Sequence, residues 1–325
     1  MFSSTIIPTI GRPSLARAVE SVLSQELPGD GFEVIVVNDS GRRLTDGDWQ
    51  HNNRVRVVRT NRCERSVARN TGAALARGEY LHFLDDDDWL LPGALERFRE
   101  LAISTQAALV YGCAELVDEV GKRVVRLNLG RSGNCFCPVM AGEWIPIGSF
   151  AVHQEDFFAV GGFHPLIRVG EDIDLCRRIA LRKDFANSPD PVVAILRGDS
   201  WNSTTLQQLA WECSNRGANR ILGERGAFRR LVRSADSSYW YGRILRRYLG
   251  AVVWSLRERH PSVALSRLFY GAMGTLVAGP RLLSKAFWKG LTTSHISGMD
   301  RNEVSLDQEA LELSRREATL RQRFL

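Results

Sequence analysis

Residues 65–89 read RSVARNTGAALARGEYLHFLDDDDW. The Ala-rich first half predicts a helix over Arg65–Ala76, and the apolar run Tyr80–Leu84 predicts a buried strand soon after it. Four consecutive aspartates, Asp85 to Asp88, follow that strand directly. Because ligands of open α/β sheets bind outside the carboxyl ends of the strands, this stretch predicts both the fold class and the position of a site.

The alternation of strand and helix continues on both sides of this stretch. Apolar runs of β-type residues end in turn-forming residues, and the segments between them carry apolar residues at helical spacing. This alternation predicts an α/β fold with a mostly parallel sheet flanked by helices. The expected strands are Ser3–Ile7, Phe32–Val37 and Arg54–Arg59, and the expected helices are Pro13–Gln25 and Pro92–Ile103.

The pattern is looser after residue 105. Residues 128–145 are rich in Gly, Asn and Cys and have little periodicity, which predicts a mobile loop. Further strands are expected at Ala108–Cys113, Arg123–Leu127, Ile145–Val152 and Pro191–Leu196, and helices at Glu171–Arg182 and from Thr204 onward. The predicted domains are residues 1–203, with halves at about 1–105 and 106–203, a basic helical extension at 204–299 and a helical tail at 300–325.

The composition narrows the class of protein. The chain has 325 residues, of which 44% are hydrophobic and 25% charged, and these proportions exclude a disordered chain and a polytopic membrane protein. Its net charge of +6 indicates an anionic partner, such as a nucleic acid, a phosphorylated substrate or an anionic membrane. The N-terminus lacks the pattern of a secretory signal, and the six cysteines form no CxxC pair. We therefore expect reduced thiols and a cytoplasmic protein.

Positive charge is concentrated near the C-terminus. Residues 225–290 contain thirteen Lys and Arg against two acidic residues, a local net charge of +11, with ten aromatic residues among them. The longest uncharged stretch, Leu268–Pro280, has 13 residues, whereas a membrane-spanning helix needs about 20. The segment therefore predicts either peripheral contact with an anionic membrane, at its inner face, or a helical bundle packed on the α/β domain with solvated arginines.

Two other kinds of partner concern the C-terminal part. Basic and aromatic residues also occur in proteins that bind single-stranded nucleic acid, but the chain has no recognised nucleic-acid motif, so we expect no nucleic-acid partner. The tail at 300–325 has mixed charge and leucines at helical spacing. A homo-oligomer formed through this tail is one alternative, and flexible attachment is another.

The four aspartates indicate a charged ligand. Adjacent carboxylates repel one another unless a cation lies among them, and hard oxygen ligands suit Mg²⁺ or Mn²⁺ together with phosphate oxygens. The alternative is a solvated acidic turn that stabilises the start of the helix at Pro92. The position directly after a buried strand favours the metal site. Asp39 follows the strand at 32–37 and has two similar interpretations, a ligand-binding residue or a turn residue before Ser-Gly.

Four segments, in order along the chain, carry a resemblance to a known family. They are Ile7-Pro8-Thr9, Val36-Val37-Asn38-Asp39, the stretch at 65–88, and Gly161-Gly162-Phe163 with the later Glu171-Asp172. Together they resemble the family 2 glycosyltransferases, which are inverting enzymes with the GT-A fold and an Asp-x-Asp motif. The resemblance implies a GT-A-type (Rossmann-like) domain that moves a sugar from a nucleotide-sugar, most simply a UDP-sugar, to an acceptor hydroxyl. Such transfer belongs to glycan, glycolipid or glycoconjugate biosynthesis.

The resemblance also implies roles on the donor side. Asp87 would be the direct ligand of Mn²⁺ or Mg²⁺ and Asp85 a supporting ligand, with the ion bridging both phosphates. Asp39 would accept a hydrogen bond from the base, and Asp86 would reach the ribose. The nucleotide-binding residues implied are Pro8, Thr9, Asp39, Arg65, Asp85 and Asp86, with Arg197 as a diphosphate ligand in a loop where many relatives carry a histidine.

On the acceptor side, the resemblance implies that Asp172 is the general base and that Glu171 supports it or orients the acceptor. Both residues also suit the first turn of the helix predicted at 171–182, where acidic side chains interact favourably with the helix dipole. A rigid helix start would hold a base in place, so the two interpretations are compatible.

Two other functions stay open as alternatives. A non-catalytic nucleotide-sugar-binding or scaffold protein would keep the fold, but it would be expected to lose the base or the metal carboxylates. A sugar nucleotidyltransferase normally has a Gly-rich phosphate loop near the start of the chain, whereas residues 9–13 contain a single glycine, Gly11. The sequence does not predict whether the acceptor is a glycan, a lipid-linked group or a small molecule.

Overall fold

The computed structural model describes residues 1–27, 31–60, 64–118, 123–167, 169–196, 217–233, 237–257 and 259–293. The strands are β1 (Ser3–Thr9), β2 (Phe32–Asn38), β3 (Val55–Arg59), β4 (Tyr80–Phe83), β5 (Trp89–Leu90), β6 (Leu109–Val117), β7 (Arg123–Leu127), β8 (Phe150–His153) and β9 (Phe185–Leu196). The helices up to residue 180 are α1 (Leu15–Leu23), α2 (Arg65–Leu75), α3 (Ala94–Thr105), α4 (Phe136–Ala141), α5 (Gln154–Ala159) and α6 (Glu171–Ala180), with 3₁₀ turns η1 (Asp48–His51) and η2 (Ile147–Ser149). The later helices are α8 (Ala227–Val232), α9 (Ser237–Arg257), α10 (Pro261–Ala278) and α11 (Lys285–Thr292), with the 3₁₀ turn η4 (Gly279–Leu283) before α11.

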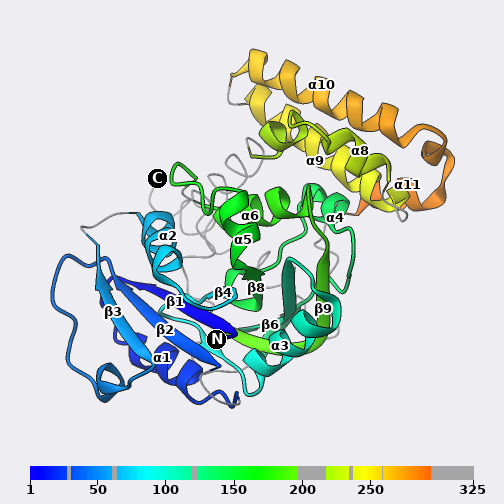
Figure 1. Ribbon diagram of the computed structural model, residues 1–325. Helices are drawn as coiled ribbons and strands as arrows, with labels where there is room; N and C mark the ends of the chain where they lie inside the picture. Colours follow the sequence, from blue (N-terminus) through cyan, green and yellow to red (C-terminus); the bar gives the residue numbers. More distant parts are fainter. Residues whose placement is uncertain are drawn as a thin grey trace.

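The strands form one sheet of nine, in the order β3-β2-β1-β4-β8-β6-β9-β5, with β7 paired to β6 beside this path. Helices cover both faces of the sheet, and α8 to α11 form a further layer to one side (Figure 1). This is the α/β architecture that the sequence predicts, with strands and helices within a few residues of their expected bounds in the N-terminal part.

The strands β3, β2, β1 and β4 run parallel. Their apolar residues are in register, since Ile6 of β1 pairs with Ile35 of β2 on one side and with Phe83 of β4 on the other. Parallel strands have their carboxyl ends at the same edge of a sheet, so Thr9 and Asp39 lie at the same edge as the residues that follow β4.

The other half of the sheet is mixed. β8 is antiparallel to both β4 and β6, whereas β9 is parallel to β6. The short β5 pairs antiparallel with β9, with Trp89 opposite Ala194. The four aspartates between β4 and β5 are therefore held beside the carboxyl end of β9, which ends at Leu196.

Two apolar cores lie on the two faces of the sheet. Successive residues of a strand alternate between them: Ile6 and Val37 belong to the core under α2, α5 and α6, whereas Ile7 and Val36 belong to the core under α1 and α3. Figure 1 shows these two groups of helices on opposite faces. The near-continuous apolar run of β2 follows from this burial on both faces.

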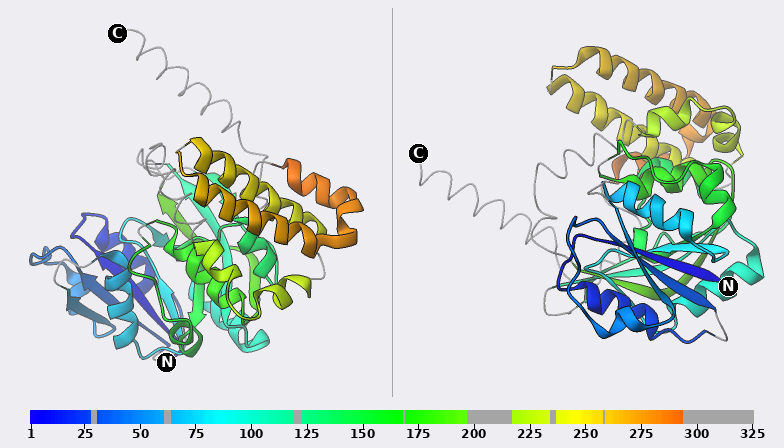
Figure 2. Two further views of the ribbon diagram at one scale, coloured as in Figure 1. Left: turned by 90° about the horizontal axis from the view of Figure 1, so that it is seen from above. Right: turned by 60° about the vertical axis from the view of Figure 1, so that its left-hand side comes forward.

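The C-terminal helices pack in layers on the α/β domain. α9 lies between that domain and α10, and α11 lies against α9 (Figures 1 and 2). α9 and α11 approach very closely at Gly242 and Gly290, where a Cβ on either glycine would overlap the backbone of the other helix. Within the described ranges, no helix is both long and apolar enough to span a bilayer.

One prediction for the second half of the chain is wrong. Residues 128–145 were expected to form a mobile loop, but they contain α4, whose Phe136 and Met140 are fully buried. These side chains belong to the same apolar core as Trp240 and Tyr241 of α9. The burial therefore comes from helices that follow about a hundred residues later, which local composition cannot reveal. The predicted strand Ile145–Val152 is also shorter, because η2 precedes β8.

The predicted domain boundaries remain predictions. The boundary between 203 and 204, the start of a helix at Thr204 and the tail at 300–325 all lie outside the described residues. The core shared by α4, α6 and α9 shows that the C-terminal helices are packed into the second half of the α/β domain.

Candidate active site

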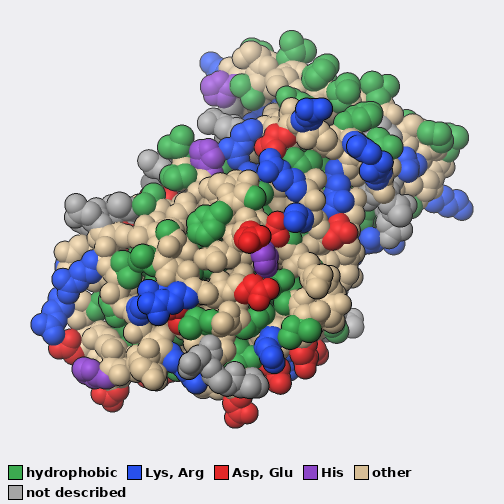
Figure 3. Space-filling model, in the orientation of Figure 1, with side chains coloured by type: hydrophobic (Ala, Val, Ile, Leu, Met, Phe, Trp, Pro, Cys, Tyr) green, Lys and Arg blue, Asp and Glu red, His purple; other side chains and the backbone are tan. Residues whose placement is uncertain are grey.

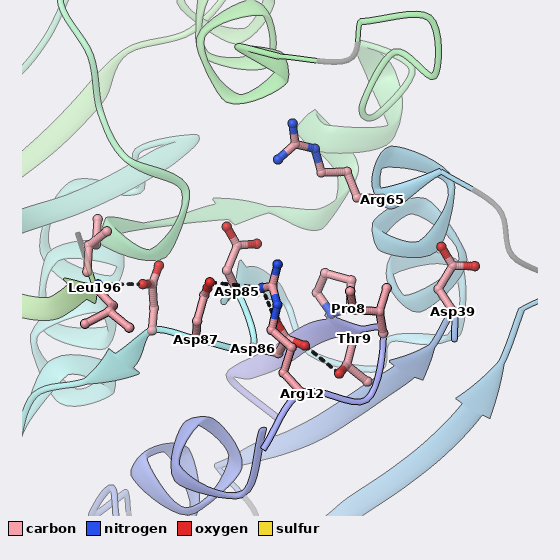
Figure 4. A pocket seen from close by; sticks show the side chains of 12 residues that line it. Pro8, Thr9, Arg12, Asp39, Arg65, Asp85, Asp86, Asp87 and Leu196 are labelled. Atoms are coloured by element: carbon pink, nitrogen blue, oxygen red, sulfur yellow. Dashed lines mark hydrogen bonds and ion pairs between the residues drawn. The ribbon is translucent and has the colours of Figure 1, made fainter. Parts of the chain in front are cut away.

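A cavity of about 360 Å³ opens at the carboxyl edge of the sheet. Three strand ends line it: Pro8 and Thr9 from β1, the aspartates after β4, and Leu196 from β9. Asp39, after β2, lies on the other side of Pro8 and Thr9 from the aspartates, and Arg65 extends over the cavity from the start of α2 (Figure 4). Six of the residues expected to bind a nucleotide therefore line one cavity, namely Pro8, Thr9, Asp39, Arg65, Asp85 and Asp86.

Three carboxylates at this edge are arranged like the ligands of a cation. One oxygen from each of Asp85, Asp87 and Asp88 lies within 4.8 Å of the other two. Burial, together with the charge of Asp85, raises the pKa of Asp87 above its ordinary value. The same causes raise the pKa of Asp88 well above its ordinary value. A divalent cation would relieve this repulsion, so the donor set fits Mn²⁺ or Mg²⁺.

Asp88 is held in place by the end of β9. Its Oδ1 accepts a hydrogen bond of 3.0 Å from the backbone N–H of Leu196. This contact joins the acidic run to a strand that begins about a hundred residues later in the sequence. Asp88 has no predicted role, because four consecutive aspartates do not show which three turn toward one another.

Arg12, in the turn after β1, neutralises part of the acidic run. Its Nη1 donates to Asp86 Oδ1 at 2.7 Å and to Asp87 Oδ2 at 2.9 Å. The hydroxyl of Thr9 donates to Asp86 Oδ2 at 2.6 Å. Both oxygens of the buried Asp86 are therefore engaged by donors of the chain itself, as Figure 4 shows. Its expected contact with a ribose stays a prediction.

Arg69 connects the two expected functional centres. This guanidinium is 1% exposed and donates from Nη2 to Asp85 Oδ1 and from Nη1 to Glu171 Oε1, the latter at 2.7 Å. Although burial raises the pKa of Asp85, the charge and hydrogen bond of Arg69 outweigh it and hold that pKa below its ordinary value. Arg65 adds a second ion pair to Glu171, with Nε and Oε1 3.2 Å apart.

Asp172 lies in the first turn of α6, next to Glu171. Trp144 Nε1 donates to its Oδ2 at 2.6 Å, and the backbone N–H of Ile173 donates to its Oδ1 at 2.8 Å. Burial and the neighbouring charge of Glu171 raise the pKa of Asp172 to about 6, while these two hydrogen bonds act in the opposite direction. A carboxyl group with this pKa can accept a proton near neutral pH, as a general base must.

Asp39 lies at the junction of two cavities. Its backbone N–H donates to Thr9 O at 2.8 Å, and its Oδ1 accepts from the hydroxyl of Thr60 at 2.8 Å. A second cavity, of about 520 Å³, shares Ile10 and Asp39 with the first and is lined by Arg42 and Arg43. The two hydrogen bonds fix Asp39 between β1 and the end of β3.

The family of the chain follows from a comparison with known proteins. A family model described as Glycosyl transferase family 2 matches residues 4–168, which is half of the chain and includes β1, the acidic run and the Gly161-Gly162-Phe163 segment. The chain belongs to glycosyl transferase family 2.

Family 2 relatives cover parts of the chain. An uncharacterised glycosyltransferase of Haemophilus influenzae is 25% identical over 186 residues, which are 56% of this chain and 63% of that protein. The poly(ribitol-phosphate) β-N-acetylglucosaminyltransferase TarP of Staphylococcus aureus is 32% identical over 115 residues, 34% of this chain and 35% of that protein. The chain therefore spans less than two thirds of the length of either relative.

A solved family 2 structure shares the fold. The crystal structure of S. aureus TarS 1–349 in complex with UDP-GlcNAc is similar with a TM-score of 0.57 at 15% identity, covering 77% of this chain and 73% of that chain. At this identity the similarity concerns the fold alone. It confirms the GT-A-type fold that the family resemblance implied.

Three residues with a predicted role are not among the described residues that line the cavity at the carboxyl edge of the sheet. Glu171 and Asp172 do not line the cavity of Figure 4, but Arg69 joins Glu171 to Asp85. Arg197 lies outside the described residues.

Four functional candidates were missed, namely Arg12, Arg69, Asp88 and Trp144. Only Arg69 had a sequence signal, because it lies four residues after Arg65 and hence on the same face of α2.

Proposed function

We propose that this family 2 protein is a metal-dependent, inverting glycosyltransferase that transfers a hexosyl group from a UDP-sugar to an acceptor hydroxyl, with Asp172 as the general base. The observation that carries the proposal is the connection between two carboxylate centres of different character. One is the cluster at Asp85, Asp87 and Asp88, and the other is Asp172, whose pKa is about 6. Arg69 and Glu171 join them.

The proposed donor site is the cavity at the carboxyl edge of the sheet. A divalent cation held by Asp85, Asp87 and Asp88 would supply positive charge that stabilises the leaving nucleoside diphosphate. Asp39, which contacts Thr9 and Thr60, would accept a hydrogen bond from the base of the nucleotide. Two similar proteins make a UDP-linked hexosamine the first donor to test. TarS 1–349 was solved with UDP-GlcNAc, and TarP is a β-N-acetylglucosaminyltransferase.

The proposed base accepts the proton of the acceptor hydroxyl as that oxygen attacks the anomeric carbon. Its pKa of about 6 leaves Asp172 mostly ionised at neutral pH, and it is a stronger base than a solvated aspartate. Trp144 fixes the orientation of the carboxylate through Oδ2. Glu171 forms ion pairs with Arg69 and Arg65, and its charge raises the pKa of the neighbouring Asp172.

The test compares chemistry with binding in the variant Asp172→Asn. Release of UDP from candidate UDP-sugars in the presence of Mn²⁺, with water as the sugar acceptor, measures hydrolytic turnover even when the natural acceptor is unknown, and titration calorimetry measures binding of UDP. We expect turnover to fall by at least about 100-fold, because the amide cannot accept the proton. Mn²⁺-dependent binding of UDP should be unchanged.

A matched control is Asp156→Asn, which removes a partly buried carboxylate of α5 that pairs with Lys183 at 3.0 Å, away from the cavity. This variant should keep turnover close to that of the unmodified protein. Near-normal turnover of Asp172→Asn would show that the base is another group. UDP binding without any release of UDP from the unmodified protein would favour a non-catalytic sugar-nucleotide-binding protein.

A further inference from the structure

Helix α10 has its apolar side chains on the outside. Leu265, Leu268, Phe269 and Leu276 are exposed, and the exposed fraction of Leu276 is 74%. Among the residues of α10 whose side chains the structure describes, the buried ones are small or charged instead: Ala264, Arg267, Gly271 and Ala278. A helix on the surface of a globular protein normally has the opposite arrangement, with its apolar stripe toward the core.

The inward face of α10 is specifically built for its neighbour α9. The guanidinium of Arg267, 1% exposed, donates from Nη1 to Ala251 O at 3.1 Å and to the hydroxyl of Ser255. A Cβ at Gly271 would lie 3.2 Å from Tyr248 Cβ, so the two helices are already packed tightly here. Rotating α10 to bury its leucines would break these contacts. The outward position of the apolar stripe is thus a fixed property of the fold.

The other C-terminal helices also expose large apolar side chains. Of the twenty large hydrophobic side chains that are exposed in the described part of the chain, thirteen lie between residues 228 and 288. They include Leu283, which is 89% exposed, and Trp288 of α11. In Figure 3, hydrophobic side chains gather over the outer part of the C-terminal layer, with Lys and Arg along its flank toward the α/β domain. Apolar patches of this extent mark interaction sites.

The charges around this surface have one sign. Residues 237–293 contain nine Lys and Arg and a single acidic residue, Glu258. Five of the nine are exposed, namely Arg246, Arg257, Arg259, Lys285 and Lys289. Of these, Arg257 and Arg259 lie at the turn between α9 and α10, and the two lysines belong to α11. A partner of this surface must accept apolar side chains and bring negative charge.

We propose that the outward face of α10, with Leu283 and Trp288, lies on the surface of an anionic lipid bilayer. The apolar side chains would enter the boundary between headgroups and acyl chains, and the surrounding Lys and Arg would face the lipid phosphates. The helix would lie in the plane of the membrane. This inference is independent of the proposed function, because it uses no residue of the active-site cavity.

Charge decides between a bilayer and a second copy of the chain. Two copies joined through the same face would bring two strongly basic surfaces together, and like charges oppose such a contact. An anionic bilayer satisfies both properties of the surface at once.

The test is co-sedimentation of the full chain with vesicles of phosphatidylcholine alone or of phosphatidylcholine mixed with phosphatidylglycerol. We expect binding to the anionic vesicles, little binding to the neutral ones, and weaker binding at high salt. The double variant Leu265→Glu/Leu276→Glu should reduce binding at least tenfold, because it places two charges in the apolar stripe. Replacing Lys285 and Lys289 by Gln should weaken binding about fivefold per charge.

The control is Leu166→Glu, which changes a leucine that is 84% exposed in the α/β domain. Its binding to anionic vesicles should equal that of the unmodified protein. Release of UDP by each variant, or its far-UV circular dichroism, verifies that the fold is intact, since all these side chains are on the surface.

Two outcomes would overturn the proposal. The first is equal binding of the double variant and the unmodified protein to anionic vesicles. The second is absence of vesicle binding combined with a dimer, seen by analytical ultracentrifugation, that the double variant loses; this would assign the face to a second copy of the chain.

Discussion

The acidic edge, by which we mean Asp85 to Asp88 together with Glu171 and Asp172, differs from the outward face of α10 in the surroundings of its side chains. At the acidic edge, each carboxylate of the sets 85–88 and 171–172 accepts a hydrogen bond from an arginine, a hydroxyl, an indole or a backbone N–H. On α10, the large apolar side chains face water while the helix buries Ala, Gly and Arg.

The carboxylates of the acidic edge already have contacts within the chain, whereas the large apolar side chains on the outward face of α10 are exposed to water. Groups held rigidly before a ligand arrives lose little entropy when it binds, which suits chemistry that depends on position. Apolar groups that are exposed to water, by contrast, are stabilised only when a partner covers them. Variants at the acidic edge should therefore change stability, ligand binding or reaction, whereas variants on α10 should change none of the three.

The largest effect is expected at Arg69. Replacing it by Met leaves Asp85 and the buried Glu171 without their shared cation, and breaking a buried ion pair from one side costs about 3–5 kcal/mol. Urea unfolding of Arg69→Met measures this loss. Arg69→Lys keeps one charge but not the two-armed geometry, so its stability should be intermediate. Equal stability of Arg69→Met and the unmodified protein would contradict the bridging role.

Asp87 should affect binding more than stability. Asp87→Ala removes one of the three clustered carboxylates, and we expect Mn²⁺-dependent binding of UDP to weaken at least about 100-fold. Chelation of divalent ions by EDTA should weaken UDP binding to the unmodified protein similarly. Calorimetry with and without Mn²⁺ measures both effects. Asp190→Ala, which changes an exposed aspartate of β9, is the matched control and should bind UDP normally.

The acidity of Asp172 should appear in the pH dependence of the reaction. The base must be ionised, so kcat/KM for UDP release should fall about tenfold per pH unit below a pH of about 6. In Trp144→Phe the carboxylate loses a hydrogen bond that favours its charged form. The pKa should then rise, and this limb of the profile should move to higher pH by up to about one unit. An unchanged limb in Trp144→Phe would assign it to another group.

The smallest effect is expected on α10. Leu268→Ser changes a side chain that is already in water, so the free energy of unfolding should change by less than about 0.5 kcal/mol. Phe136→Ala, in the buried α4, should cost about 3–5 kcal/mol. Chemical denaturation measures both. A large loss for Leu268→Ser would show that its face is covered in solution.

The elements that were predicted correctly are those whose burial follows from the pattern of their own residues. β1, β2 and β4 are short strands buried on both faces, and α1 has apolar residues at helical spacing, so these elements match their predictions closely. α4 could not be predicted, because its burial depends on α9. The inverted arrangement of α10 was equally invisible, since its sequence shows apolar and polar residues but not which set faces the neighbouring helix.

The candidate site divides in the same way. The aspartates at 85–88 and the pair at 171–172 were predicted from motifs and from their positions after a strand or at a helix start. Arg12 and Trp144 were missed because their roles depend on contacts with Asp86 and Asp172, which are 74 and 28 residues away in the chain. Sequence separation of this size is bridged only by the folded sheet.

The position of Arg69 constrains how this protein can be recombined. The arginine belongs to α2, whose Arg65 lines the proposed donor cavity, but one arm of its guanidinium holds Glu171 at the start of α6. A chimera that joins the first hundred residues of one relative to the second half of another would pair this arginine with a helix start that it did not evolve beside. Under the proposed function, donor and acceptor preferences would therefore not be separable, and an exchange of either should carry α2 and the start of α6 together.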